Sequence, residues 1–421
     1  MEVRLAYGTD GLPVEVPGDR ATVVEPEYHP GAEDPAGLLR EAVKRPVSGP
    51  PLRDLVRPGQ KVAISICDVT RPQPRKVMLQ VVLDELDGIV EPEDVVVLVA
   101  TGTHRGNTRE ELLDMLGEEL LGRVRVVNHD CRNSYSLVYM GEFGRGVPTW
   151  LNLEWARADV RITTGFVEPH FFAGFSGGPK MVAPGLAGLD TVLTLHDAAR
   201  IGSPEATWGV REGNPVHDDV RAIAAATGVD FALDVILNRE QHVVSAFGGE
   251  IFAMHDAACG AARNIAMVKL EEAFDVVLTT NSGYPLDQNL YQAVKGMSAA
   301  EKVVKEGGVI VCAAECRDGL PDGGEYDRML GSGSTIGGLL RSIEGRERTE
   351  PDQWQVQIQA QVQEKARVLV YSDFLEEDRL EAAHLQKTWN VGETVREALD
   401  EAGPGSRLCV LPEGPQTVPY L

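Results

Sequence analysis

An alternation of apolar, strand-like runs with helical segments is the feature that most constrains the fold of this chain. Residues 61–67 (KVAISIC) and 94–100 (DVVVLVA) are nearly continuous apolar runs, typical of strands that are covered on both faces. Between them, residues 76–86 have the pattern of an amphipathic helix. Strands that alternate with helices predict parallel sheets, so we expect an α/β fold with mainly parallel sheets.

The alternation restarts near residue 270, which we take as a domain boundary. A chain of 421 residues exceeds what one hydrophobic core usually supports, so two domains are expected. We predict an N-terminal α/β domain over residues 1–269 and a C-terminal α/β domain over residues 270–421, with the active site in the cleft between them. The last segment could instead pack back on the N-terminal domain.

The remaining elements follow from the same patterns. Further strands are expected at residues 123–127, 159–164, 274–279, 309–313, 366–371 and 407–411, and hairpins near the N-terminus and over residues 230–237 and 241–247. Further helices are expected at residues 37–44, 109–116 (capped by Asn107 or Thr108), 189–200 (with Asp190 as N-cap), 216–226, 252–268, 291–305, 336–343, 353–364 and 391–401.

The composition excludes several classes of protein. A formal charge of −24, from 64 acidic and 40 basic residues, argues against a nucleic-acid or anionic-membrane binder, because both need a cationic face. The six cysteines form no CxxC pair, and the first residues lack a basic segment followed by an apolar one. The longest apolar runs are too short to span a bilayer. We therefore expect a cytoplasmic, reduced protein without a targeting signal.

Polar groups follow four of the predicted strands. In parallel sheets, ligands bind beyond the carboxyl ends of the strands. Any one of these groups could merely cap a helix or complete a turn, but four in succession indicate a functional site. The four strings are DVTRP (68–72), TGTHR (101–105), TGFVEPH (164–170) and TNSGYPLDQ (280–288).

The third string opens a glycine-rich loop that reaches residue 188 and contains His170, Ser176 and Lys180. Glycines let the backbone approach a ligand closely, and several N–H groups can then point at an anion. Lys180 and Ser176 are candidate nucleophiles in this loop. The alternative is a tight strand-to-helix turn whose Lys180 is a solvated surface charge.

Three histidines are candidates for chemistry. His104 and His170 each come just after a buried strand, where an imidazole can accept and return a proton, and two such bases can serve opposite faces of one carbon. His196 could bind a metal such as zinc, copper, iron or nickel, although a helix histidine is more often part of the packing. The sequence lacks HExxH and CxxC motifs, so a metal cage built from protein ligands alone is poorly supported.

Three further residues could bind a carboxylate. Arg71 follows a strand and offers a two-pronged donor, while Tyr291 and Lys295 share one helix face at a spacing of i,i+4. Surface solvation of Lys295 and core packing of Tyr291 are the alternatives.

Several long motifs, in order across nearly the whole chain, resemble the nickel-pincer lactate racemase family. They are DVTRP (68–72), TGTHRGNT (101–108), GFVEPHFFAGFSGGPKMVAPGLAG (165–188), the helix that ends at His196, YPLDQNLYQAVKGM (284–297) and DQW (352–354). Their coincidence is specific for the family and much less specific for the substrate.

The resemblance implies a bound cofactor and a mechanism. Lys180 would form a thioamide link to pyridinium-3-thioamide-5-thiocarboxylic acid mononucleotide, whose two sulfurs and one ring carbon hold nickel, and His196 would be the fourth nickel ligand. His104 and His170 would deprotonate the substrate hydroxyl from either side while hydride moves from the α-carbon to the cofactor. Hydride returned to the opposite face of the planar intermediate inverts the centre.

The resemblance also assigns supporting residues. Asp68 and Thr70 would lie near the cofactor or orient a base, and the glycines would let the loop approach the mononucleotide. Phe171 and Phe172, beside His170, are the positions suspected of setting the size of the substrate side chain. Residues expected near the cofactor are Asp68, Thr70, Gly177 and Gly178, and those expected around the substrate are Arg71, Tyr291, Gln292, Lys295 and Trp354.

The sequence therefore predicts an isomerase, a racemase or epimerase that inverts the α-carbon of lactate or a related 2-hydroxy acid. Its expected partners are the small substrate and the enzymes that build the cofactor, with no nucleic acid and no membrane. Two alternatives remain: a lysine enzyme that forms a Schiff base with a carbonyl acid through Lys180, and a nucleotide- or cofactor-binding protein without turnover.

Overall fold

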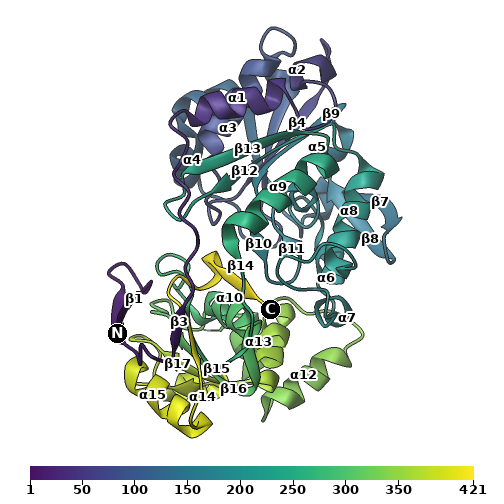
Figure 1. Ribbon diagram of the computed structural model, residues 1–421. Helices are drawn as coiled ribbons and strands as arrows, with labels where there is room; N and C mark the ends of the chain where they lie inside the picture. The colour runs from purple at the N-terminus through teal and green to yellow at the C-terminus, as the bar shows by residue number, and fades with distance from the viewer. Residues whose placement is uncertain (322) are drawn as a thin grey trace. The chain divides into compact units, whose positions relative to one another are not determined.

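The computed structural model describes residues 1–321 and 323–421 and divides into two compact units (Figure 1). Unit 1 comprises Met1–Glu27, Asp197–Gly202 and Ala266–Leu421, and unit 2 comprises Tyr28–His196 and Ser203–Ile265. Unit 1 thus combines the first 27 residues and a short segment after His196 with the C-terminal part of the chain from Ala266 onward.

Unit 2 is built on a six-stranded sheet in the order β13-β12-β9-β4-β5-β6. All neighbours are parallel except β12 and β13, which form the predicted antiparallel hairpin. Every residue of β4 is buried, which agrees with its continuous apolar sequence. The strands are β4 (Val62–Cys67), β5 (Val95–Ala100), β6 (Arg125–Asn128), β9 (Val160–Phe166), β12 (Phe231–Leu237) and β13 (Val243–Gly249).

Helix α3 packs against both α1 and α4 and shares an apolar core with the sheet (Figure 1). That core includes Leu39 of α1, Leu79 of α3 and Leu116 of α4, each essentially inaccessible to solvent. The helices of unit 2 are α1 (Pro35–Lys44), α2 (Leu52–Leu55), α3 (Arg75–Leu86), α4 (Arg109–Arg123), α5 (Leu153–Arg157), α6 (Leu189–Leu195), α8 (Pro215–Thr227) and most of α9 (Ile251–Ala266).

The ends of two helices test the predicted caps. Of the two predicted caps of α4, Asn107 and Thr108, the structure has Thr108, which forms a reciprocal capping box with Glu111. The predicted helix over residues 189–200 is wrong in its cap and its length. Helix α6 has Gly188 at its N-cap and ends before His196, whose φ of −113° and ψ of 22° are not helical. Asp197 then caps a separate short helix, α7 (Ala198–Ile201).

Unit 1 contains a second six-stranded sheet, entirely parallel, in the order β18-β17-β16-β15-β19-β3. Its edge strand β3 comes from the first residues of the chain and pairs with β19, which explains why Met1–Glu27 belongs to this unit. The strands are β3 (Ala21–Val23), β15 (Phe274–Thr280), β16 (Val304–Ala313), β17 (Arg367–Tyr371), β18 (Gln386–Lys387) and β19 (Leu408–Leu411).

Small antiparallel and parallel pairs complete unit 1. The predicted N-terminal hairpin is formed by β1 (Glu2–Leu5) and β2 (Leu12–Glu15), and β14 (Met267–Lys269) pairs with the last strand, β20 (Val418–Tyr420). The last segment thus stays within unit 1. The helices are α10 (Leu290–Glu301), α11 (Glu325–Leu330), α12 (Ile336–Glu344), α13 (Gln353–Lys365), α14 (Glu377–Ala382) and α15 (Val391–Ala402). Helix α10 ends four residues earlier than predicted because the chain there enters β16.

A hairpin in unit 2 is among the elements that the sequence did not predict. Strands β7 (Leu137–Phe143) and β8 (Val147–Asn152) form an antiparallel hairpin against which α6 packs. In the two described ranges of the chain, no helix is long and apolar enough to cross a membrane.

Candidate active site

Three polar loops leave the carboxyl ends of neighbouring parallel strands in unit 2. Strand β4 leads to Asp68, β5 leads to His104, and β9 leads into the glycine-rich loop. The last loop is packed against the other two strand ends. The N–H of Gly102 donates to the carbonyl of Gly185 (3.0 Å), and the sulfur of Cys67 lies 3.7 Å from that of Met181. Three of the four polar strand ends therefore meet at one edge of a sheet, and the fourth, after β15, belongs to unit 1.

Asp68 joins Thr70 to His104. One carboxylate oxygen lies 2.6 Å from Nδ1 of His104, and the other accepts the Thr70 hydroxyl (2.7 Å). Burial disfavours the Asp68 carboxylate, but His104, Arg71 and Thr70 together outweigh this, so that the pKa of Asp68 falls below its usual value. An ionised Asp68 only accepts hydrogen bonds, so Nδ1 of His104 is the protonated nitrogen and Nε2 can act as a base.

The backbone of this loop is held by two buried side chains. The Arg75 guanidinium donates to the carbonyl of Cys67 (2.8 Å) and also to those of Asp68 and Arg71. Gln73 accepts the N–H of Cys67 (2.7 Å) and donates to the hydroxyl of Thr164 (2.8 Å) on β9. The position of the Asp68 carboxylate is therefore determined from both sides, which suits a residue that orients a base.

His170 stands in a short hairpin between β10 (Pro169–His170) and β11 (Gly174–Phe175). Its ring stacks on Phe171 (centroids 4.8 Å apart) and meets Phe172 edge-on (4.5 Å). The backbone N–H of Ala173 points at Nδ1 (3.3 Å), so Nδ1 is the acceptor and Nε2 carries the proton of the neutral ring. The imidazole is thus held in one orientation at the edge of an aromatic cluster.

Phe172 also contacts Lys180 and His196. The Lys180 ammonium lies 5.7 Å from the centre of the Phe172 ring, and the ring of His196 meets the same phenylalanine edge-on with centroids 5.2 Å apart. Lys180 is half-buried in the 3₁₀ turn η3 (Gly178–Met181). His170, Lys180 and His196, which the sequence predicts as a base, the cofactor anchor and a metal ligand, therefore all lie around the side chain of Phe172.

His196 is suited to bind a metal. Its Nδ1–H donates to the carbonyl of Val192 (2.7 Å), which leaves Nε2 as the unprotonated nitrogen. Burial, together with the positive charge of Lys180, lowers the pKa of His196 to about 4, so the ring is neutral at physiological pH. Within residues 1–321 and 323–421, no three His, Cys, Asp or Glu side chains gather as a metal site.

The two glycines of the turn are constrained by the protein itself. Gly177 and Gly178 have φ angles of +73° and +48°, in the left-handed region that favours glycine. A Cβ at Gly177 would lie 2.7 Å from the carboxylate of Asp234, and one at Gly178 would lie 2.5 Å from the ring of His255. These positions therefore need glycine for packing in addition to any role toward a cofactor.

Asp234 on β12 lies beneath this turn, completely buried. One oxygen accepts the N–H of Gly178 (2.6 Å). The other oxygen, Oδ1, meets no hydrogen-bond donor among the described residues. Burial raises the pKa of Asp234 to about 7, although the N–H of Gly178 favours its ionised form.

This raised pKa predicts a pH-dependent effect of Asp234→Asn on stability. The unfolded carboxyl ionises near its usual value and the folded one only near pH 7, so the folded state binds more protons in between, and wild-type stability falls as pH rises through that window. We therefore expect the free energy of unfolding of Asp234→Asn, measured relative to that of wild type, to be about 1–3 kcal/mol higher at pH 8 than at pH 5. Urea unfolding of both proteins at the two pH values measures this, and an equal difference at both would contradict it.

The remaining predicted site residues lie in unit 1. Tyr291, Gln292 and Lys295 are on helix α10, which packs against α13, the helix that carries Trp354. The Tyr291 hydroxyl donates to Asp352 (3.4 Å), the residue that precedes α13 and has a φ of +62°. The packing of α10 on α13 thus groups these four side chains within one unit.

Two family models together span most of the chain: the lactate racemase N-terminal domain over residues 7–209 and the lactate racemase C-terminal domain over residues 269–418. The chain belongs to the lactate racemase family. It is 34% identical to the lactate racemase of Thermoanaerobacterium thermosaccharolyticum over 98% of this chain and 97% of that protein. It is 33% identical to the lactate racemase of Lactiplantibacillus plantarum over 89% of each.

Solved structures agree with this assignment. The structure resembles the lactate racemase apoprotein of T. thermosaccharolyticum with a TM-score of 0.93, 33% identity and complete coverage of both chains. A Thermotoga maritima protein of 19% identity shares the fold with a TM-score of 0.67 over 93% of this chain and 99% of that one. The predicted family, the α/β fold and the enzyme class, an isomerase, are therefore confirmed.

Sequence reasoning missed several residues that shape this lactate racemase-type site. Arg75 and Gln73 lie in the string DVTRPQPR, directly after a predicted buried strand, so their position was a usable signal. Asp234 stands inside an otherwise apolar strand, where a lone carboxylate also signals a special role. His255 gave no such signal, because it lies within a helix whose buried face is known only from the structure.

Proposed function

We propose that this protein inverts the α-carbon of a small 2-hydroxy acid, lactate or a close relative, with the help of a lysine-linked nickel-pincer nucleotide. The observation that carries the proposal is the clustering of His170, Lys180 and His196 around Phe172. His170 and Lys180 lie in the loop that also packs against the strand ends leading to Asp68 and His104, and His196 follows helix α6. The curated relatives are named lactate racemases, which supports the same reaction.

His104 and His170 are the proposed acid/base pair. Asp68 holds the Nδ1–H of His104, so Nε2 can take the proton of a substrate hydroxyl and later return it. His170, held by its two phenylalanine neighbours, is the proposed base for the other enantiomer. To take a proton at Nε2 it must first change to the tautomer that carries its proton on Nδ1, in place of the one that the Ala173 N–H favours. Two bases on different loops are what inversion requires, because the enantiomers present the hydroxyl from opposite sides of the reacting carbon.

Lys180 and His196 are the proposed cofactor-binding residues. Lys180 would carry the nucleotide as a thioamide, and Nε2 of His196, unprotonated at physiological pH, would bind nickel. When bound, the nickel-pincer nucleotide supplies an electron sink that takes up the α-hydride and gives it back. Phe172 shields the lysine and the histidine from water on the side where it contacts them.

Both units contain further residues with proposed roles in binding or orientation. In unit 2, Arg71 is the substrate-carboxylate donor, Asp68 orients His104 and Thr70 orients Asp68. The glycines of the turn shape the cofactor anchor. In unit 1, the proposed substrate-binding residues are Tyr291, Gln292, Lys295 and Trp354.

A panel of α-deuterated, single-enantiomer 2-hydroxy acids tests the proposal. Protein produced together with the cofactor-building enzymes and nickel should invert at least one acid and keep the deuterium on the α-carbon, because the label moves as hydride. Inversion with exchange of the deuterium into solvent would contradict hydride transfer, and no inversion of any acid would contradict the function. Borohydride trapping of substrate on Lys180 would instead support a Schiff-base enzyme.

A further inference from the structure

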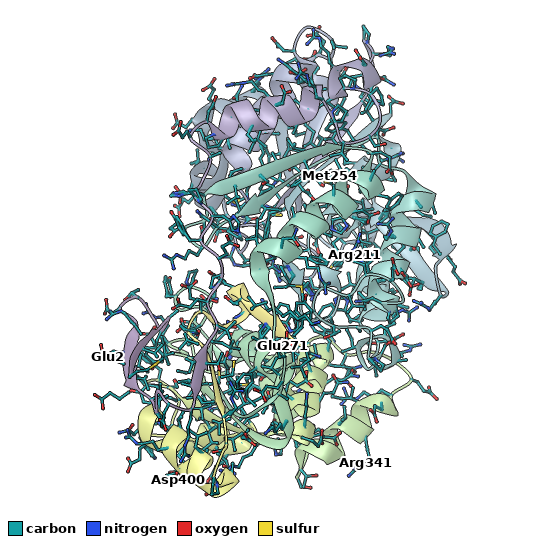
Figure 2. The ribbon with its side chains drawn as sticks, viewed as in Figure 1. Glu2, Arg211, Met254, Glu271, Arg341 and Asp400 are labelled. Carbon is teal, nitrogen blue, oxygen red and sulfur yellow. The ribbon has the colours of Figure 1, made fainter. Side chains whose placement is uncertain are left out.

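The turn before Lys180 is held from two separate elements of unit 2. The N–H of Gly178 donates to Oδ2 of Asp234 on β12 (2.6 Å), and the carbonyl of Ser176 accepts from Nε2 of His255 on α9 (2.8 Å). His255 follows Met254, which is labelled on α9 in Figure 2. Both side chains are at most 1% exposed. Side chains from a strand and a helix therefore hydrogen-bond to the backbone of the turn at two positions, Gly178 and Ser176.

The packing around these two side chains leaves the turn little freedom. Asp234 lies directly opposite Gly165 in the parallel β9–β12 register, and a Cβ at Gly165 would come within 2.9 Å of Oδ1. On the other side, the ring of His255 fills the space beside Gly178. His217 stacks on His255 with centroids 5.8 Å apart. A displacement of the turn toward Asp234 or toward His255 would therefore produce a clash.

Lys180 is connected directly to this fixed part of the turn. Its backbone N–H donates to the carbonyl of Gly177 (3.1 Å), and Pro179 stiffens the backbone between the glycines and the lysine. Asp234 achieves this at a cost, because one oxygen of this completely buried carboxyl has no hydrogen-bond partner among the described residues, which destabilises a fold relative to a well-packed apolar side chain.

We propose that Asp234 and His255 are positioning residues that fix the turn Ser176–Gly178 and so hold Lys180 in the geometry needed for attachment of its cofactor. The attachment part of this inference rests on the proposed function, in which Lys180 is the anchor. The fixing of the turn does not. Neither residue touches the reacting atoms, so both act through the backbone of the loop.

Matched substitutions separate positioning from general stability. Asp234→Ala removes the acceptor for Gly178, whereas Asp234→Asn keeps a carbonyl oxygen of the same size. His255→Leu removes the donor to Ser176, whereas His255→Gln keeps an N–H. Asp219→Ala is the control, because Asp219 is also buried and accepts the N–H of Arg145 beside the left-handed Gly144, in a different turn.

Two measurements are made on each variant. Hydrogen exchange of a peptide spanning residues 176–181 needs no cofactor and includes the amides of Gly178, Lys180 and Met181, whereas Pro179 has no amide hydrogen. We expect Asp234→Ala and His255→Leu to exchange there at least about tenfold faster than wild type, and the two conservative variants and Asp219→Ala to match wild type. Intact mass after production with the cofactor-building enzymes should show a several-fold lower adduct fraction in the same two variants alone.

The outcomes distinguish the two proposals. Wild-type protein without an adduct, but with the expected exchange pattern, would refute the lysine anchor and leave the fixing of the turn supported. Normal exchange and normal adduct in both Asp234→Ala and His255→Leu would overturn the positioning roles. If Asp234→Ala fails to fold, the comparison of His255→Leu with His255→Gln decides the matter. A lower adduct fraction in Asp219→Ala as well would also overturn the positioning roles of Asp234 and His255, because general destabilisation would then explain the loss of adduct.

Discussion

Replacing Lys180 by alanine is expected to reduce racemisation to the uncatalysed background and to leave the chain without a nucleotide adduct. The physical reason is that the cofactor carries the difficult chemistry, and a side chain that ends at Cβ cannot form the covalent link. The turn around Lys180 should be preserved, because the hydrogen bonds to Asp234 and from His255 involve backbone groups of Gly178 and Ser176.

Lys180→Arg is the informative companion to this variant. Arginine keeps the positive charge next to Phe172, but its guanidinium is protonated at all accessible pH values and is a poor nucleophile. We expect Lys180→Arg to be as inactive as Lys180→Ala and equally free of adduct by intact-mass analysis. An active arginine variant would show that Lys180 contributes only charge, as the solvated-turn interpretation of the sequence requires.

Loss of either proposed base should slow the reaction about 10²–10⁴-fold, the usual contribution of general acid–base catalysis. Because each histidine would serve one enantiomer, the loss should be asymmetric in a single turnover. We expect His104→Ala to oxidise one enantiomer to the 2-oxo acid at nearly the wild-type rate and the other at the reduced rate. His170→Ala should show the opposite preference. Rapid quench of matured protein with each enantiomer, followed by quantification of the 2-oxo acid, measures this.

Controls make the asymmetry interpretable. His242→Ala removes an exposed histidine on the β12–β13 connection and should leave both rates unchanged. Asp68→Asn should lower the oxidation rate only for the enantiomer that depends on His104, because Asp68 contacts the ring of His104 and not that of His170. Equal losses for both enantiomers in both histidine variants would contradict a pair of bases with separate roles.

Much of the fold follows from local sequence patterns. The run VAISIC is a buried strand because a continuous apolar segment of this length must be covered on both faces, and Thr108 with Glu111 forms a cap from side chains three residues apart. The candidate loop was also recognisable, because its glycines, His170 and Lys180 come directly after a strand, and ligands bind where parallel strands end. These features depend on residues that are near one another along the chain.

Pairings between distant segments were decided only by the tertiary structure. The assignment of Met1–Glu27 to unit 1 depends on β3 pairing with β19, nearly the whole chain away, and no local pattern specifies that partner. The helix predicted through His196 is interrupted because Asp197 caps a new helix that belongs to the other unit. In each case a local propensity was outweighed by contacts made elsewhere.

The support beneath Lys180 shows the same division most clearly. Local sequence patterns suffice to show that a glycine-rich loop with a lysine follows a buried strand. Only the tertiary structure brought Asp234 opposite Gly165 and placed His255 beside Gly178, because a strand register and the rotation of a helix set which side chains face the loop. A shift of one residue in that register would turn Asp234 to the other face of the sheet, so its role follows from pairing and not from its neighbours in the chain.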